Sequence, residues 1–462
     1  MARRFGRRAA AAGVAAALAI GPVQLPARAA GPGAVPAAPS APAAPSAPAA
    51  PSAPAAPSAP AAPSAAAVRR PPTMPFDPAK LRATLDATRD AGMYGLFSEA
   101  RDGATRWDGA SGVADARTRR PVEPGMRQRV GSITKTFVAA AILQQVEAGR
   151  VRLDAPVDDY LPGLVPQGLG TQITVRMLLD HTSGIGDYVT VAFPSLGELS
   201  PKSLDDFRFR DVPPEQLIKW GLSAPRTGMP GERWSYSNTN YIIAGRLLER
   251  VTGTKAEQYI TRNVIEKAGL KHTYFPSSPW VVGPHPRMYE SLYQHVKPPR
   301  DYSVFDMSWA STAGALVSTM DDLNRFYRRL LTGRIIGKDA LAQMKRTVPV
   351  KDADGNVLMN YGLGVYSLDL PCGTFWGHDG AVFGAGTQSL SSAGGARQVS
   401  VALNLMKYQQ LNANGTPVPH PIDNALAAHV VEALCGTESA AGPTGPDEPL
   451  RLLPLQSLPG AG

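Results

Sequence analysis

"RVGSITKTFVAAAILQQVEAGR", residues 129–150, is the stretch that decides the fold prediction. Most of it is apolar, which predicts a helix that packs into the core. Ser132 stands where this helix begins, and Lys135 follows three residues later, directly before the apolar run "TFVAAAIL". Gly131 permits a tight entry into the helix. A lysine is unexpected at the start of a helix with almost no polar face.

The spacing of Ser132 and Lys135 suits a nucleophile beside its base. Residues three apart on a helix are neighbours, so the amine can reach the hydroxyl. A serine is a weak nucleophile until a base removes its proton. Burial and the positive end of the helix dipole both lower the pKa of the amine, and the amides that open the helix can bind an oxyanion. The alternative is an N-cap serine followed by a solvated lysine, because Ser-x-x-Lys is frequent by chance.

A second stretch with suitable polar residues is "WSYSNTN", residues 234–240. Tyr236 could relay the serine proton to a leaving group, and Asn238 could bind a substrate amide and hold Lys135 in place. The alternative is a loop that only caps the following helix.

A third stretch is "FWGHDGAVFGAG", residues 375–386, which reads as a strand. His378 supplies a polar side chain, and Gly380 lets an extended substrate approach the strand edge. A strand histidine without a function is the alternative. Each stretch alone suits its simpler interpretation, and the three together indicate a site.

Strand patterns occupy both ends of the folded region, and helical patterns lie between them. The chain is expected to form a hairpin at 93–115, helices at 77–92, 129–150, 173–185, 237–253, 318–331 and 422–434, and strands at 361–370, 374–383, 387–395 and 397–405. This order predicts an α+β fold in which both chain ends join one antiparallel sheet flanked by helices.

The two ends of the chain differ in composition from the folded region. Residues 1–29 have a basic start, an alanine-rich apolar run and an Ala-Arg-Ala end, which predicts a signal peptide. Its five arginines account for the fall in net charge from +9 to +4 on cleavage. Residues 30–72 are expected to form an Ala/Pro/Ser-rich disordered linker, residues 73–436 the folded domain that carries the three stretches, and residues 437–462 a disordered tail. The protein is therefore expected to be secreted, and the linker also suits attachment to a cell wall.

The two cysteines, Cys372 and Cys435, suit one disulfide in an exported chain. Such a bond would join the last helix to the segment before "WGHDG". Two buried free thiols are the alternative.

The three motifs resemble the penicilloyl-serine set Ser-x-x-Lys, Ser-Asp-Asn and Lys-Thr-Gly, in the branch where Tyr-x-Asn and His-x-Gly take the second and third places. That branch contains class C beta-lactamases, related esterases, D-aminopeptidases and secreted D-alanyl-D-alanine carboxypeptidases. The resemblance covers most of residues 76–436 and includes "VGSITKTF", "ITVRMLLDHTSGI" and "GHDG". It implies the beta-lactamase/D,D-peptidase fold, with an all-helical subdomain inserted, and it implies that the two cysteines are paired.

By position, the resemblance makes Ser132 the acylated nucleophile, Lys135 its base and Tyr236 a proton shuttle. His378 would be a polar partner of Tyr236 on the strand edge. The resemblance also implies these substrate contacts: Asn238 to the acyl amide, the Ser132 and Ala381 N–H groups as oxyanion hole beside Gly380, and Trp309 and Phe193 as aromatic walls. His181 in "DHTSG" is interpreted as structural.

The substrate pocket departs from the carboxypeptidase pattern. Ala381 follows Gly380 and has no hydroxyl, and the neighbouring strand offers Tyr366 and Ser367 but no arginine to bind a terminal carboxylate. Asp379 adds a negative charge that would repel such a group. A neutral ester, amide or amidated peptide therefore suits this pocket better than a free D-alanine carboxylate.

The sequence thus predicts a secreted serine hydrolase that forms an acyl-enzyme on peptide or ester carbonyls. D-alanyl-D-alanine carboxypeptidase action on peptidoglycan-type peptides comes first, esterase or D-aminopeptidase action second, and beta-lactamase action third. A penicillin or peptidoglycan sensor without turnover is the alternative of another class. No cofactor or metal is expected, because no histidine pair has the spacing of helix ligands. The basic residues form no stripe with aromatics, which argues against nucleic acid as a partner, and we expect a monomer.

Overall fold

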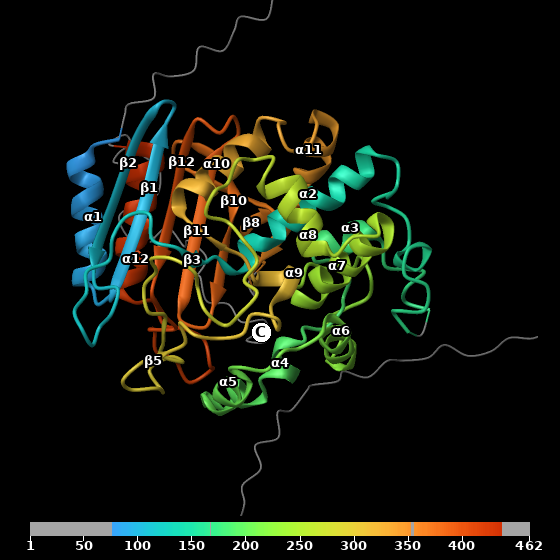
Figure 1. Cartoon of the computed structure of the whole chain (residues 1–462), viewed down its shortest axis with the longest axis horizontal. Helices are drawn as coiled ribbons and strands as arrows, with labels where there is room; N and C mark the ends of the chain where they lie inside the picture. Colours follow the sequence, from blue (N-terminus) through green and yellow to red (C-terminus); the bar gives the residue numbers. More distant parts are fainter. Residues whose placement is uncertain (1–75, 167, 353–354, 437–462) are drawn as a thin grey trace, which may run out of the picture. The chain divides into compact units, whose positions relative to one another are not determined.

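The computed structural model describes residues 76–166, 168–352 and 355–436, and Figure 1 shows them as a sheet with helices on both faces. The predicted signal peptide, the whole Ala/Pro/Ser linker, residues 73–75 of the predicted domain and the tail lie outside the described residues. Those boundaries remain predictions. In the part of the chain that is described, no helix combines the length and apolarity needed to cross a bilayer.

Eight antiparallel strands form the central sheet, in the order β2-β1-β12-β11-β10-β9-β8-β7. Their bounds are Gly95–Asp102 (β1), Thr105–Gly112 (β2), Val348–Lys351 (β7), Val357–Tyr361 (β8), Tyr366–Leu370 (β9), Gly373–Val382 (β10), Ala385–Ser392 (β11) and Arg397–Leu403 (β12). β1 pairs with β12, with Leu96 opposite Leu403. Segments from both ends of the folded region therefore meet inside one sheet, which confirms the predicted α+β fold.

Helices cover both faces of this sheet. α1 (Pro78–Asp90) and α12 (Pro421–Cys435) pack against each other on one face, and α10 (Met320–Leu331) packs on the other face against β1, β11 and β12 (Figure 1). The remaining helices are α2 (Thr134–Glu147), α3 (Val175–Leu179), α4 (Val189–Ala192), α5 (Lys202–Phe207), α6 (Pro214–Ser223), α7 (Asn238–Thr252), α8 (Ala256–Ile260), α9 (Ser311–Gly314) and α11 (Lys338–Met344). Most of these form the predicted helical insertion between β2 and β7.

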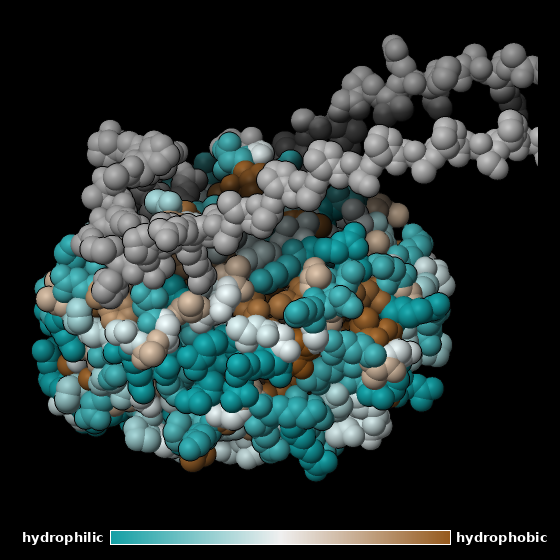
Figure 2. All heavy atoms as spheres, turned by 90° about the horizontal axis from the view of Figure 1, so that it is seen from above, coloured by the Kyte–Doolittle hydropathy of each residue, from teal (hydrophilic) through white to brown (hydrophobic). Residues whose placement is uncertain are grey.

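Short strands tie the insertion to the sheet. They are β3 (Gln128–Arg129) with β6 (Val317–Ser318), and β13 (Leu405–Met406) with β4 (Tyr289–Glu290) and β5 (Arg300–Asp301). Hydrophilic residues cover most of the face drawn in Figure 2, and hydrophobic residues show there in smaller patches. This is the distribution expected when the apolar sides of sheet and helices face inward.

Local signals placed most helix ends correctly. The Asp77 carboxylate accepts the Ala79 N–H at 2.8 Å and caps α1, and Gly253 ends α7 with a φ of 65°. The helix predicted over residues 173–185 is wrong in length, since α3 ends at Leu179. His181 has a φ of 62°, a left-handed conformation that takes the chain out of the helix.

Cys372 and Cys435 form the predicted disulfide, with their Cα atoms 5.4 Å apart. It joins the turn between β9 and β10 to the last residue of α12. The end of the described chain is thereby fixed to the strand that carries His378.

Candidate active site

Ser132 lies in a turn of 3-10 helix, Gly131–Ile133, that leads into α2. Gly131 has a φ of 52°, and a Cβ on it would lie 2.6 Å from the Ala381 nitrogen of β10. A Cβ on Gly380 would lie 1.9 Å from the Val130 oxygen and 2.7 Å from the Ser132 nitrogen. The two glycines therefore let β10 pack directly against the turn, which brings the Ser132 and Ala381 amides close together.

Lys135 is completely buried one turn after Ser132, as expected from the apolar run that follows it. Its Nζ lies 3.0 Å from Ser132 Oγ, 2.8 Å from Asn238 Oδ1 and 2.8 Å from the Ala313 carbonyl oxygen. Both Asn238 Oδ1 and the carbonyl can only accept hydrogen bonds. A neutral amine would donate its two hydrogens to these oxygens, which leaves its lone pair directed at the serine hydroxyl.

The environment of Lys135 favours the neutral amine. Burial lowers its pKa to about 7, although the charges of Asp187 and Asp379 act in the opposite direction. No carboxylate lies within ion-pair distance of Nζ among the described residues. A substantial fraction of the protein therefore carries an uncharged amine beside Ser132 at neutral pH.

Asn238 is held in one orientation by Asp187. The carboxylate oxygen Oδ2 of Asp187 accepts both the backbone N–H and the side-chain Nδ2–H of Asn238, at 2.7 and 2.8 Å. Its Oδ1 accepts the Val189 N–H at 2.8 Å. Because the amide nitrogen of Asn238 is thus directed at Asp187, its oxygen faces Lys135.

Tyr236 completes the group around the serine. Its hydroxyl donates to Ser132 Oγ at 2.6 Å, and the centre of its ring lies 4.7 Å from Lys135 Nζ. Burial raises the pKa of Tyr236 well above its ordinary value, so the phenol is protonated. Ser132 therefore lies between a proton donor and a proton acceptor.

His378 has a different partner from the one predicted. Its Nδ1 donates to the Asp379 carbonyl, so its Nε2 accepts the hydrogen of Tyr361 at 2.8 Å. The prediction that His378 pairs with Tyr236 is wrong. Tyr361 of β8 lies opposite Tyr366 of β9, which lies opposite Gly377 of β10, and this register places the Tyr361 hydroxyl at the histidine. Burial lowers the pKa of His378 to about 3, so the ring stays neutral.

His181 packs inside the site beside Tyr236. Its ring centre lies 4.3 Å from that of Tyr236, and its Nδ1 accepts the Ser237 N–H at 3.2 Å. Burial lowers its pKa well below the usual range, so the ring is neutral. His181 thereby supports both the Tyr236 ring and the backbone beside it.

The predicted aromatic walls are present but lie deeper than expected. Trp309 is 8% exposed and stacks on Phe383 at a centroid distance of 5.0 Å. Phe193 is fully buried and contacts both rings edge-on at 5.1 Å, so it supports the wall and does not line it. Phe383, which is 4% exposed, is the ring that stacks on Trp309.

The edge of β10 next to the serine is free. Pairing of β10 with β9 ends at Gly377 and Tyr366, so residues 378–382 have no strand partner on that side among the residues that the structure describes. Asp379 lies in this segment with 22% of its side chain exposed, and burial raises its pKa to about 6. Ala381 is exposed and offers its backbone but no hydroxyl.

Sequence reasoning missed Asp187 and Tyr361. No short-range pattern distinguishes Asp187 from other loop acids, because its partner Asn238 is 51 residues away. Within residues 76–166, 168–352 and 355–436, no three His, Cys, Asp or Glu side chains are grouped as metal ligands. The arrangement supplies a nucleophile, a neutral base, a proton donor and amides for an oxyanion.

Comparison with known proteins identifies the family. Residues 81–416 match the Beta-lactamase family. The chain belongs to that family. This confirms the predicted superfamily, which contains serine hydrolases, and it agrees with the observed sheet and helical insertion.

Among curated relatives, the chain is 32% identical over 222 residues to Esterase EstB of Burkholderia gladioli, covering 46% of this chain and 56% of the esterase. It is 28% identical over 274 residues to the D-aminopeptidase of Cereibacter sphaeroides, covering 56% of this chain and 50% of that protein. The matches thus span about half the length of these relatives. A D-stereospecific amidohydrolase structure from Streptomyces sp. has 33% identity and a TM-score of 0.68, over 78% of this chain and 99% of that one.

Proposed function

We propose that the protein hydrolyses amide or ester bonds through an acyl-enzyme on Ser132. Ser132 Oγ attacks the substrate carbonyl while its proton passes to the neutral amine of Lys135. The oxyanion binds the N–H groups of Ser132 and Ala381. The Tyr236 hydroxyl gives its proton to the leaving group and is reprotonated from Lys135, and water then attacks the acyl group to release the acid.

One observation carries this proposal. Ser132 Oγ lies 3.0 Å from the buried amine of Lys135 and 2.6 Å from the Tyr236 hydroxyl. The first distance suits removal of the serine proton, and the second suits its delivery to a leaving group. His378 contacts Tyr361 instead of these atoms, so its role is to hold the strand edge and not to transfer the proton.

The proposed substrates are amides or esters of D-amino acids whose leaving group carries no free carboxylate. Asp379 raises the pKa of Lys135, so its charge is felt in the cleft, and Ala381 offers no hydroxyl to a carboxylate. The names of the relatives, an esterase, a D-aminopeptidase and a D-stereospecific amidohydrolase, support the same class.

A second candidate is D-alanyl-D-alanine carboxypeptidase action on peptidoglycan-type peptides, outside the cell. The free edge of β10 over residues 378–382 favours it, because an extended peptide could pair with that edge. Beta-lactam turnover follows third, since the same serine would be acylated. Secretion, and the predicted signal peptide that it depends on, are part of this proposal.

A substrate panel tests the proposal. It compares a nitrophenyl ester, a D-phenylalanine amide, a cephalosporin, and a D-Ala-D-Ala peptide with a free or an amidated end, each with wild type and Ser132→Ala. We expect wild type to cleave the ester and the amide, Ser132→Ala to lose activity, and the amidated peptide to be at least as good as the free one. A strong preference for the free carboxylate would favour the carboxypeptidase instead.

The sensor alternative makes a different prediction. A sensor would be labelled stoichiometrically by a fluorescent penicillin and would turn over no ester. Turnover of any panel substrate that depends on Ser132 excludes it.

A further inference from the structure

Four arginines surround a pocket that shares no residue with the catalytic cleft. The pocket has a volume of about 350 Å³ and lies where the end of α10 meets the turn between β11 and β12. Arg325, Arg328 and Arg329 come from α10, and Arg334 follows it. So many guanidinium groups in so small a space repel one another unless an anion lies between them.

These arginines have few acidic partners in the described part of the chain. Among the four, and counting partners within residues 76–166, 168–352 and 355–436, only Arg325 makes an ion pair, with Asp321 at 3.5 Å. Its Nε is buried and has no hydrogen-bond partner in those ranges. No side-chain hydrogen bond or ion pair is found there for Arg328, Arg329 or Arg334. The positive charges of Arg328, Arg329 and Arg334 are therefore not paired with any acid of the described residues.

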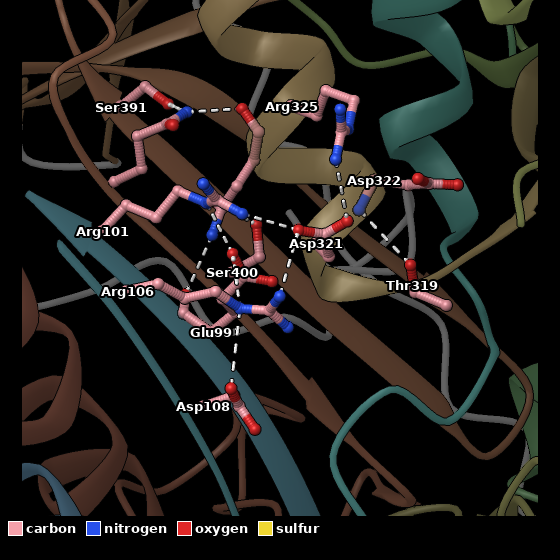
Figure 3. Close-up of polar contacts among 12 residues, drawn as sticks. Glu99, Arg101, Arg106, Asp108, Thr319, Asp321, Asp322, Arg325, Ser391 and Ser400 are labelled. Atoms are coloured by element: carbon pink, nitrogen blue, oxygen red, sulfur yellow. Dashed lines mark hydrogen bonds and ion pairs between the residues drawn. The ribbon is translucent and has the colours of Figure 1, made fainter. Parts of the chain in front are cut away.

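The nearby carboxylates are already occupied. Figure 3 shows Asp321 between three arginines, and its Oδ1 accepts from Arg101 at 2.6 Å. Asp102, at the start of the β1–β2 turn, is paired with Arg397 at 2.8 Å. Asp321 thus pairs with one arginine of the pocket, Arg325, and with two arginines outside it, and Asp102 pairs with none of the four pocket arginines.

Backbone forms the opposite wall. Gly395 has a φ of 66°, and a Cβ on it would lie 2.9 Å from the Cα of Arg328, so this turn packs directly on α10. The Gly103 N–H donates to the Ala396 carbonyl at 2.9 Å, which joins the turn to the β1–β2 hairpin. Burial and the neighbouring Arg101 and Arg325 lower the pKa of Arg328, as expected where positive charge gathers. One wall of the pocket is thus main chain that packs directly on α10, and arginine side chains form the other.

We propose that this pocket binds a phosphate-class anion with at least two negative charges, such as pyrophosphate or a segment of a phosphodiester or polyphosphate chain. Guanidinium groups bind phosphate oxygens through paired hydrogen bonds. Four of them offer more N–H donors and more positive charge than a single carboxylate can accept and neutralise. The volume accommodates such a group together with water.

The test is calorimetric titration of the full chain with inorganic pyrophosphate at low salt. We expect saturable binding at one site, weakened by at least about tenfold in Arg329→Gln with Arg334→Gln. The matched control is Arg117→Gln with Arg119→Gln, two exposed arginines between β2 and β3, for which binding should change by less than about twofold. Ester hydrolysis by Ser132 should be unchanged in both double variants.

Three outcomes would overturn the proposal: no saturable binding, equal weakening in both double variants, or equal affinity for chloride and pyrophosphate. Long-chain polyphosphate distinguishes the sources of the anion. Tighter binding per phosphate than pyrophosphate supports a polymer ligand, and equal binding supports a free anion. Arg328→Lys, which keeps the charge but not the paired hydrogen bonds, should weaken binding without loss of thermal stability.

Discussion

Lys135 and the ion-pair network of Glu99, Arg101 and Asp321 show two ways in which this protein buries charged groups. The partners of Lys135 are a hydroxyl, an amide oxygen and a carbonyl oxygen, none of them charged. Glu99 on β1 bonds to Arg101 at 2.6 Å, and Arg101 bonds to Asp321 of α10 at 2.6 Å (Figure 3). The first arrangement leaves a neutral nitrogen with a free lone pair, and the second cancels charge with charge. Reactivity is expected only in the first.

The largest effect is expected for Lys135→Met. Without the amine, Ser132 has no base, so kcat/KM for a nitrophenyl ester should fall at least about 10³-fold. Because the two residues act as a unit, Lys135→Met with Ser132→Ala should be no worse than Ser132→Ala alone. The control is Lys345→Met, another lysine whose pKa is lowered by burial, which packs over Trp376. Equal losses of kcat/KM in the two variants would show that replacing either buried lysine impairs the enzyme, and would contradict a specific role of Lys135 as the base.

Asp187→Asn should give the next largest effect. The new amide would turn its own N–H toward Asn238, which favours a flip of Asn238 that places a donor against Lys135. We expect kcat to fall about 10²-fold, with little change in KM, because the amine is misplaced. The measurement is steady-state kinetics together with thermal unfolding. Partial unfolding would also lower the apparent kcat without changing KM, so the unfolding curve must show that the variant is folded at the assay temperature.

The pH dependence of acylation depends on the protonation state of Lys135. The acylation rate should rise with pH around pH 7, because deprotonation of Lys135 produces the base. Asp379 raises the pKa of Lys135, so Asp379→Asn should move this rise to lower pH. Stopped-flow acylation across pH 5–9 measures both curves, and a shift to higher pH in the variant contradicts the account. Asp379→Asn should also improve the peptide with a free carboxylate relative to its amide.

Arg101→Gln should have the smallest effect on activity and a clear effect on stability. It leaves Glu99, whose side chain is 2% exposed, without its nearest cation, which should cost about 3 kcal/mol in the free energy of unfolding. Denaturant unfolding measures this loss. Ester hydrolysis should stay within about twofold of wild type, and a large drop in kcat at full folding would mean that the two regions are coupled.

The parts of the site that sequence predicted are those fixed by local geometry. Ser132 and Lys135 are three residues apart, in the 3-10 turn and in the first turn of α2 that follows it. Tyr236 lies two residues before Asn238, the first residue of α7. The sheet was predictable because segments with alternating apolar and polar residues occur at both ends of the folded region, and such segments need neighbouring strands for their backbone hydrogen bonds. The contacts that sequence reasoning missed or misassigned are tertiary: Asp187 meets Asn238 across 51 residues, and His378 meets Tyr361 through the register of three strands. Phe193 was expected to line the aromatic wall of the cleft. It is buried because Trp309 and Phe383 pack against its ring, and these contacts are also tertiary.

The protonation state of one nitrogen tests the account most directly. Lysine labelled with ¹⁵N at Nζ can be followed by NMR from pH 5 to 11 in wild type and in Lys135→Arg, so that the missing signal identifies Lys135. We expect that signal to titrate near pH 7. Titration at 10 or above, the ordinary range for lysine, would mean that Lys135 stays charged beside Ser132 and would contradict its role as the base.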